Sequence, residues 1–267
     1  MTLTPSSQRD VGLGTRFGRG IAPRWEILGL ACAALFLAGC ATPGPLHVYA
    51  PTSGGQRPIL DAGGGATLEV PSFLQEGDRV VGFAYDPYTD HFFQRLDPGD
   101  RIRVVDRPAR AIKREFVVAG LPKGGGDLAL RPRSGHLFLL GAAPGEVFET
   151  TRLGRLVGRI QLDPTTGPLT GLAFDSVREE LLALGSDGRR VTAHALDGRL
   201  RRELRLATPA GSSLAFDSDQ REFHAPLRDR PGAFGVFDET GRLLRTVTLP
   251  GTTGLLDLGP RSLIRVF

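Results

Sequence analysis

The segment Gly171-Leu172-Ala173-Phe174-Asp175-Ser176 recurs along the chain at a nearly constant interval. Its alanine position returns at spacings of 45, 44 and 42 residues, and a weaker fifth copy follows at 254–258. A period of about 40 to 45 residues is typical of repeat proteins in which each unit is one small sheet. The other three clear copies begin at Gly82, Asp127 and Ser213.

Each copy is followed by the same order of apolar segments and turns. A polar turn leads to a second segment, a Gly-containing loop leads to a third, and a turn that reads Gly-Arg-Leu three times leads to a fourth. Four short strands per unit predict the blade of a β-propeller. The second segments are 91–93, 136–140, 180–184 and 222–225, the third are 101–106, 146–150, 190–196 and 233–238, and the fourth end at 118, 162, 206 and 249.

The composition also indicates an all-β chain. Gly 36 and Pro 20 make up about a fifth of the 267 residues, against roughly 12% in an average protein. The hydrophobic content is nevertheless 40%, which is enough for a packed core. Many turn-forming residues beside normal apolar content indicate short strands joined by tight turns, and they exclude a helical bundle.

We expect five blades, with six as the alternative if residues 46–79 build most of a blade by themselves. Four complete units span about 80–253, and the chain ends after only two further strands. The N-terminal segments 46–50, 58–60 and 67–70 are expected to supply the missing outer strands, because a blade shared by both chain ends leaves no open edge. In this arrangement 46–50 pairs with the final strand, and 262–267 supplies one strand of the shared blade.

The units resemble the NHL and YVTN class of bacterial propellers. The resemblance rests on the Gly-Leu-Ala-Phe-Asp strand at 171–175 and on the later turn Asp238-x-x-Gly241-Arg242, and it extends over 80–267. It implies a propeller that binds at the face formed by loops between strands two and three and between successive blades. The chain departs from this class because it lacks the usual Asn-Arg loop.

On this chain the implied binding face contains six loops with charges of both signs. The loops are 96–101, 121–126, 141–145, 185–190, 227–232 and 250–254. The cluster Arg228-Asp229-Arg230 is the first choice for a partner contact, and the alternative is a solvated loop. The candidate partner-binding residues are Asp97, Asp100, Arg101, Lys123, Asp187, Arg189, Arg190, Arg228, Asp229 and Arg230.

The first 39 residues have the parts of a secretory signal peptide: a basic leader up to Arg24, an apolar run at 27–37, and small residues that end at Gly39. The run is shorter than the roughly 20 apolar residues of a membrane-spanning helix. Leu37-Ala38-Gly39-Cys40 resembles the bacterial lipobox. The resemblance implies cleavage between Gly39 and Cys40 and lipidation of the Cys40 thiol, whereas the alternative is a chance cysteine.

These features predict a signal peptide at 1–39, a lipid anchor and short tether at 40–45, and a propeller domain at 46–267. The expected partners are the membrane, through the lipid anchor, and an envelope protein or another envelope component. Ala41 stands where enterobacterial inner-membrane lipoproteins have Asp, which indicates the periplasmic face of the outer membrane. Pairing of 46–50 with the last strand would leave a tether of about six residues, or roughly 20 Å, and pairing that begins at Thr67 would leave a longer one.

No nucleic-acid partner is expected, because acidic and basic residues are interleaved and loss of the leader lowers the net charge from +4 to +2. With Cys32 removed and Cys40 lipidated, no thiol is left for a disulfide or a thiolate metal site. No catalytic residue, metal site or cofactor is predicted. The alternative function is a hydrolase that resembles the lactonase or phytase propellers, with a metal at the channel mouth.

The histidines are expected to be structural. His91 and His136 occupy the seventh position after the repeat alanine, where the other blades have Glu180 and Glu222. Such a position, in a turn that leads into a strand, is a natural place for a polar residue. The aspartates Asp86, Asp175 and Asp217 likewise share one repeat position, and we expect them to cap turns.

Overall fold

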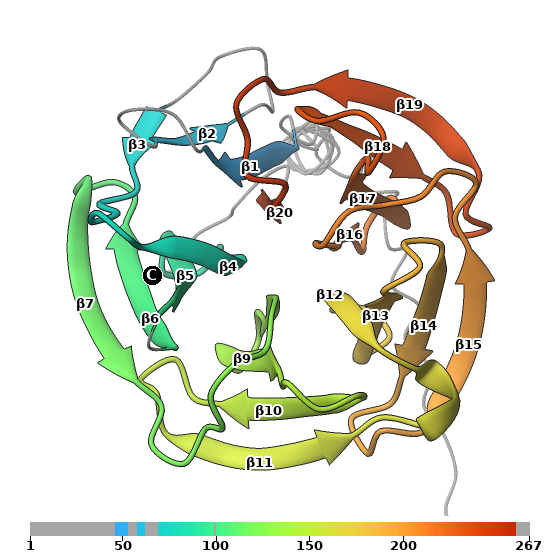
Figure 1. Cartoon of the computed structure of the whole chain (residues 1–267), viewed down its shortest axis with the longest axis horizontal. Helices are drawn as coiled ribbons and strands as arrows, with labels where there is room; N and C mark the ends of the chain where they lie inside the picture. Colours follow the sequence, from blue (N-terminus) through green and yellow to red (C-terminus); the bar gives the residue numbers. More distant parts are fainter. Residues whose placement is uncertain (1–45, 53–57, 62–68, 99, 260–267) are drawn as a thin grey trace, which may run out of the picture. The chain divides into compact units, whose positions relative to one another are not determined.

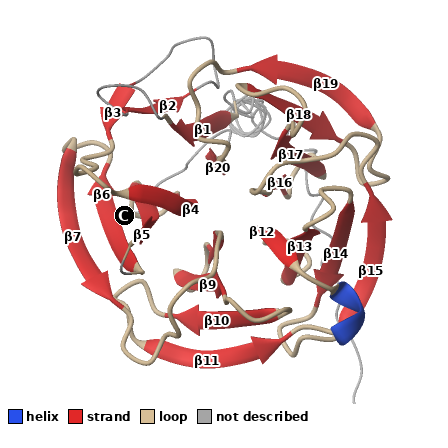
Figure 2. Cartoon of the chain, in the orientation of Figure 1, coloured by secondary structure: helices blue, strands red, loops and turns tan. Residues whose placement is uncertain are grey.

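The computed structural model describes residues 46–52, 58–61, 69–98 and 100–259. These residues form five four-stranded antiparallel sheets arranged around a common axis, which is a β-propeller (Figure 1). The predicted signal peptide, Cys40 and the segment 262–267 lie outside the described residues. The one helical element described is a 3-10 turn, η1 at Pro164–Thr166 (Figure 2), and no described helix has the length and hydropathy to cross a membrane.

Four blades are continuous in sequence, and their strands run from the axis outward in chain order. Blade 1 contains β4 (Arg79–Asp86), β5 (His91–Asp97), β6 (Arg101–Asp106) and β7 (Ala111–Val117); blade 2 contains β8 (Leu128–Arg131), β9 (His136–Leu140), β10 (Glu146–Thr150) and β11 (Leu156–Gln161). Blade 3 contains β12 (Leu169–Asp175), β13 (Glu180–Gly185), β14 (Arg190–His194) and β15 (Leu200–Arg205); blade 4 contains β16 (Ala215–Asp217), β17 (Glu222–Pro226), β18 (Ala233–Phe237) and β19 (Leu243–Thr248).

Blade 5 is built from both ends of the chain. Its innermost strand is β20 (Asp257–Gly259), followed outward by β1 (His47–Pro51), β2 (Pro58–Asp61) and β3 (Glu69–Pro71). The register places His47 opposite Gly259 and Tyr49 opposite Asp257. Five blades, one of them shared by segments from both ends of the chain, are therefore confirmed, and 46–50 pairs with the last described strand. The strand expected at 262–267 lies outside the described residues.

Crowding around the axis explains the small residues of the inner strands. A Cβ atom on Gly82 would lie 2.9 Å from the backbone nitrogen of Leu128 in the next blade, and one on Gly171 would lie 3.0 Å from that of Leu214. Contacts this short require the neighbouring backbone to move, so a side chain at either position would strain the packing between blades.

The second strands are buried on both faces because each lies between two neighbouring blades. Phe92 of β5 packs with Tyr49 and Tyr85 toward blade 5, whereas Phe93 packs with Leu128 of blade 2. The outermost strands instead alternate half-buried and exposed residues, as in β15. The core is therefore a series of seams between blades.

The apolar seam between blades 4 and 5 is packed partly by the residue that precedes β20. Leu256 is 3% exposed and packs with Ala50 of β1 and Phe234 of β18. We expect Leu256→Ala to lower the free energy of unfolding by about 2–5 kcal/mol, because it leaves a cavity at this seam. Leu244→Ala, on the outer strand where the side chain is 41% exposed, should change it by no more than about 0.5 kcal/mol. Urea unfolding followed by circular dichroism measures both, and equal losses would contradict this role of the seam.

Candidate functional site

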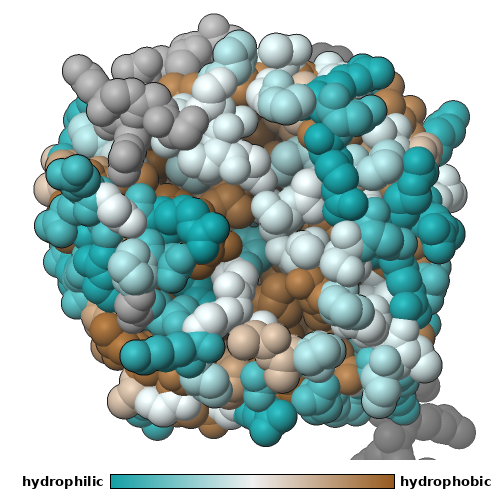
Figure 3. Space-filling model, in the orientation of Figure 1, coloured by the Kyte–Doolittle hydropathy of each residue, from teal (hydrophilic) through white to brown (hydrophobic). Residues whose placement is uncertain are grey.

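A cavity of about 740 Å³ opens at the end of the axis where the inner strands begin. We call this end the upper face; it carries the loops between strands two and three of a blade and the connections between blades. Figure 3 shows this face, hollowed at its centre. All five blades contribute to the lining, through Thr52, Leu74, Asp78, Arg79, Val80, Val81, Gly125, Gly126, Leu140, Gly141, Ala142, Leu169, Thr170, Ser212, Thr253 and Leu255.

The wall of this upper cavity mixes apolar side chains with hydroxyl groups and glycine backbone. Thr170 Oγ1 is buried at the cavity and has no hydrogen-bond partner among the described residues. Arg79 at the rim donates a 2.6 Å hydrogen bond to Asp97 and remains 74% exposed. Such a lining can bind a partly polar ligand through hydroxyl and backbone groups while apolar side chains contribute contact area.

Two carboxylates lie along the inner strands. Asp127 accepts hydrogen bonds from the backbone N–H of Phe83 in blade 1 (3.4 Å) and of Leu172 in blade 3 (3.2 Å), so it connects both neighbours of its own blade. Asp257 accepts a 2.7 Å bond from the N–H of Tyr85 and lines a second, smaller cavity at the other end of the axis. These side chains satisfy inner-strand amides that would otherwise be unpaired in the ring.

Burial raises the pKa of Asp127 to about 8, and the nearby charge of Asp257 contributes to the increase. Burial likewise raises the pKa of Asp257 to about 7. Asp257 is only half-buried because it borders the smaller cavity, so we assign the larger shift to Asp127. Sequence reasoning did not identify this pair. The available signal was that Asp127 stands at the repeat position of Gly82 and Gly171.

The raised pKa of Asp127 predicts that stability falls as pH rises. Its folded-state pKa, about 8, lies above the unfolded value of about 4, so the folded state binds the proton more tightly and loses stability between these pH values. We expect the free energy of unfolding to decrease from about pH 5 to about pH 9, and Asp127→Asn to flatten this slope. Asp197→Asn, in an exposed turn, should leave it unchanged. Urea titrations across this range measure the slopes, and an unaltered slope in Asp127→Asn would contradict the assignment.

The predicted partner-binding residues of blade 1 are engaged with neighbouring groups. Asp97 pairs with Arg79, and Asp100 accepts the backbone N–H of Gly124 (2.7 Å). Arg101 pairs with Asp78 and Glu115, and Lys123 is exposed.

The predicted partner-binding residues of blades 3 and 4 also connect loops. Asp187 caps its own turn by accepting the N–H groups of Arg189 and Arg190 (both 2.9 Å). Arg189 donates to the carbonyl of Ala207 (2.7 Å), Arg190 pairs with Glu203 (2.7 Å), and Arg228 donates to the carbonyl of Ser186 (2.9 Å). Asp229 and Arg230 are exposed.

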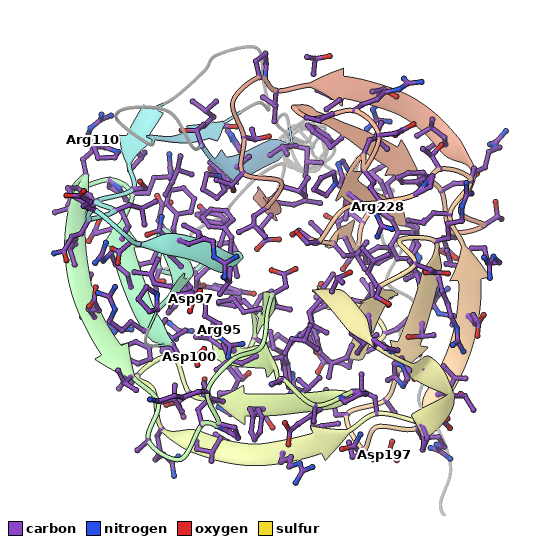
Figure 4. All side chains as sticks on the ribbon, viewed as in Figure 1. Arg95, Asp97, Asp100, Arg110, Asp197 and Arg228 are labelled. Carbon is purple, nitrogen blue, oxygen red and sulfur yellow. The ribbon has the colours of Figure 1, made fainter. Side chains whose placement is uncertain are left out.

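The described residues that line the upper cavity include none of the ten predicted partner-binding residues. In Figure 4, Asp97 and Asp100 lie with Arg95 on one side of the ring, and Arg228 lies on the other side. Contact of these residues with a partner stays a prediction.

Arg95, which sequence reasoning missed, holds one wall of the cavity in place. Its side chain is fully buried, pairs with Asp100 (2.8 Å), and donates to the carbonyls of Gly124 (2.7 Å) and Leu140 (2.6 Å). The bonds join a loop of blade 1 to two segments of blade 2 that border the cavity. Its repeat position and polar type gave no sign of this role, because the two backbone carbonyls that it binds belong to segments outside its own blade.

We expect Arg95→Leu to lower the free energy of unfolding by about 3–5 kcal/mol, because it removes the buried cation that pairs with Asp100 and donates to two backbone carbonyls. Lys123→Leu, an exposed residue of the same region, should have little effect. Chemical denaturation compares the two variants, and similar stability in both would contradict the anchoring role.

The histidines are placed as structural residues would be. His136 Nδ1 lies 2.6 Å from Glu149, and His91 Nε2 lies 3.5 Å from Asp106. At the same repeat position Glu180 pairs with Arg202 (3.1 Å) and Glu222 with Arg245 (2.9 Å). The repeat aspartates cap turns, as predicted. Each accepts a hydrogen bond from the backbone N–H two residues later in the chain, as Asp86, Asp175 and Asp217 do from Tyr88, Val177 and Asp219. In the described ranges no group of three or more His, Cys, Asp or Glu residues is placed to hold a metal ion.

No family model and no curated protein matches the chain. Among solved structures it is similar to a chain in the crystal structure of a nidogen/laminin complex, with 12% identity over 82% of this chain and 100% of that one and a TM-score of 0.57. A streptogramin B lyase matches at 15% identity over 77% of this chain and 60% of that one, with a TM-score of 0.43. Hydrazine synthase of Kuenenia stuttgartiensis matches at 12% identity over 64% of this chain, with a TM-score of 0.45; the chain spans about half (49%) of its length. At such identities the similarity shows the propeller fold alone.

Proposed function

We propose that the chain is a lipid-anchored protein of the bacterial cell envelope whose propeller binds an envelope protein or another envelope component at its upper face, without catalysing a reaction. The observation that carries the binding role is the upper cavity. It is large enough for a peptide segment or small ligand, and its wall combines apolar side chains with hydroxyl-bearing residues and glycine backbone.

The anchor part of the proposal rests on the lipobox-like segment at 37–40. The start of β1 at His47 supports a short tether, since about six residues from Cys40 to Leu46 extend over roughly 20 Å at most. A domain on so short a tether would stay close to the membrane, and a partner at the periplasmic face of the outer membrane would be within its reach.

Fatty-acid labelling tests the anchor. We expect cells that express the wild-type chain to incorporate a labelled fatty acid into it, and the Cys40→Ala variant to incorporate none, because only the thiol forms the thioether. Immunoprecipitation followed by detection of the label measures this directly. Equal labelling of both chains would contradict lipidation at Cys40.

Site-specific photo-cross-linking in living cells tests the binding face. A cross-linking residue at Ser212, which lines the upper cavity, should give a defined adduct, and one at Ser134, an exposed turn residue at the opposite end, should not give that adduct. An adduct common to both positions would argue against the cavity. A stoichiometric divalent metal in the purified chain would instead favour the alternative, a hydrolase with a metal at the channel mouth.

A further inference from the structure

Three exposed apolar side chains project from turns at the end of the ring opposite the upper cavity. We call this end the lower face; it carries the turns between strands one and two of a blade (87–90, 132–135, 176–179 and 218–221) and between strands three and four (107–110, 151–155, 195–199 and 238–242). Tyr88, Leu153 and Val177 are 63%, 69% and 65% exposed. Turn positions favour small polar residues, so folding alone does not account for these side chains.

The other exposed large hydrophobic residues also gather toward this end. Ile112, Val157 and Leu244 lie on outer strands within two residues of lower-face turns. Among the described residues only Val117 is an exposed large hydrophobic at the opposite end, where it pairs with Arg101. The exposed apolar surface is therefore concentrated on one face.

The same turns carry arginines. Arg110, Arg133 and Arg155 are exposed and form no ion pair with the residues described here. Most carboxylates of these turns are already engaged by other arginines, as in Asp90–Arg107, Glu179–Arg131 and Asp238–Arg242. On the upper face, by contrast, charges alternate in sign, as in Arg228-Asp229-Arg230.

The chain enters the ring at the lower face. His47 pairs with Gly259 at the end of blade 5 that corresponds to the Asp86–His91 pair of blade 1. Leu46 borders the smaller cavity of about 150 Å³ together with Pro87, Pro132 and Ser218 from the lower ends of blades 1, 2 and 4. A lipid on Cys40 therefore attaches about six residues from this face.

We propose that the lower face docks on the anionic phospholipid surface to which Cys40 anchors the chain, with Tyr88, Leu153 and Val177 entering the headgroup boundary and Arg110, Arg133 and Arg155 contacting lipid phosphates. This rests on the proposed lipid anchor. Apolar side chains at the interface and nearby basic residues both favour attachment to anionic bilayers. A second copy of the same face is a poor occupant, because its unpaired arginines would repel.

Docking in this way would set the orientation of the domain. A tether alone leaves a domain free to tilt, whereas contacts from blades 1, 2 and 3 hold the lower face against the bilayer. The upper cavity would then point away from the membrane toward an incoming partner.

The chain offers a clean means of testing this orientation. Residues 40–267 contain every described strand of the ring. Cys40 is their only thiol and they contain no tryptophan, since Cys32 and Trp25 lie in the leader. This chain can be coupled through Cys40 to a maleimide lipid in vesicles of phosphatidylglycerol and phosphatidylcholine. Single tryptophans are introduced as Leu153→Trp on the lower face and Val117→Trp as the matched control at the upper end.

We expect brominated phospholipids to quench the emission of the Leu153→Trp chain and shift it to shorter wavelength, and to leave that of Val117→Trp unchanged. Equal quenching at both positions, or quenching at neither, would overturn the docking. A blue shift of the Leu153→Trp chain that appears without vesicles and grows with protein concentration would also overturn it, in favour of self-association.

The arginines are tested with the untethered chain carrying Cys40→Ser. Arg110→Gln, Arg133→Gln and Arg155→Gln should each weaken sedimentation with phosphatidylglycerol vesicles by about fivefold, as expected for one basic residue at an anionic surface. Lys123→Gln and Arg230→Gln on the upper face should leave binding unchanged. Equal effects of the two sets would overturn the contact of these arginines with lipid.

These measurements are independent of lipidation in the cell. Coupling through maleimide attaches the chain at Cys40 whether or not the cell acylates it, so a negative fatty-acid labelling result would refute the anchor and leave the quenching result readable. Conversely, absence of quenching with normal labelling would refute the docking alone.

Discussion

The pairing of β1 with β20 is the interaction on which the rest of the ring depends. It joins residues about 200 positions apart, and it places Tyr49 between Tyr85 and Phe92 of blade 1 while Leu256 packs against blade 4. Without it the ring would have two open seams, each exposing apolar side chains and unpaired strand edges. Both cavities depend on it as well, because Thr52 and Leu255 border the upper one and Leu46 and Asp257 the lower one. Closure and the construction of the candidate site are therefore the same event.

Crowding at the axis is the second constraint. Five inner strands approach so closely that Gly82 and Gly171 have no room for a Cβ, and their axial amides cannot all be satisfied within the sheets. Asp127 and Asp257 accept hydrogen bonds from several of these amides. Because both carboxylates are taken out of water, their pKa values rise. The ring thus uses two titratable groups as structural acceptors. Their carboxylate oxygens are occupied by backbone N–H groups, which is consistent with a structural role for both acids.

The two faces differ in chemistry because they are built from different connections. The upper face includes the connections between blades, which are longer than the lower-face turns. Charged residues at this face bind one another and backbone carbonyls, and the buried Arg95 of β5 joins two of its segments beside the cavity. The lower face is formed by short turns, where aspartates such as Asp86 and Asp175 take up the turn amides and leave adjacent positions free for apolar and basic residues. A cavity on one face and exposed apolar and basic side chains on the other are the features on which the proposed binding and docking roles rest.

The sequence by itself determined the repeating unit, because a blade is a local structure: alternating strands, turn aspartates and glycines are all encoded within about 45 residues. It also identified the shared blade, since the last unit lacked strands that the N-terminal segment could provide. The tertiary structure alone decided the register of β1 against β20, the partners of Arg95 and the position of Asp127 between two other blades. These contacts join residues from different units, and no local pattern records which units meet. The upper cavity and the lower face were likewise decided by the tertiary structure, because each is assembled from short segments of several blades and exists only after the ring has closed.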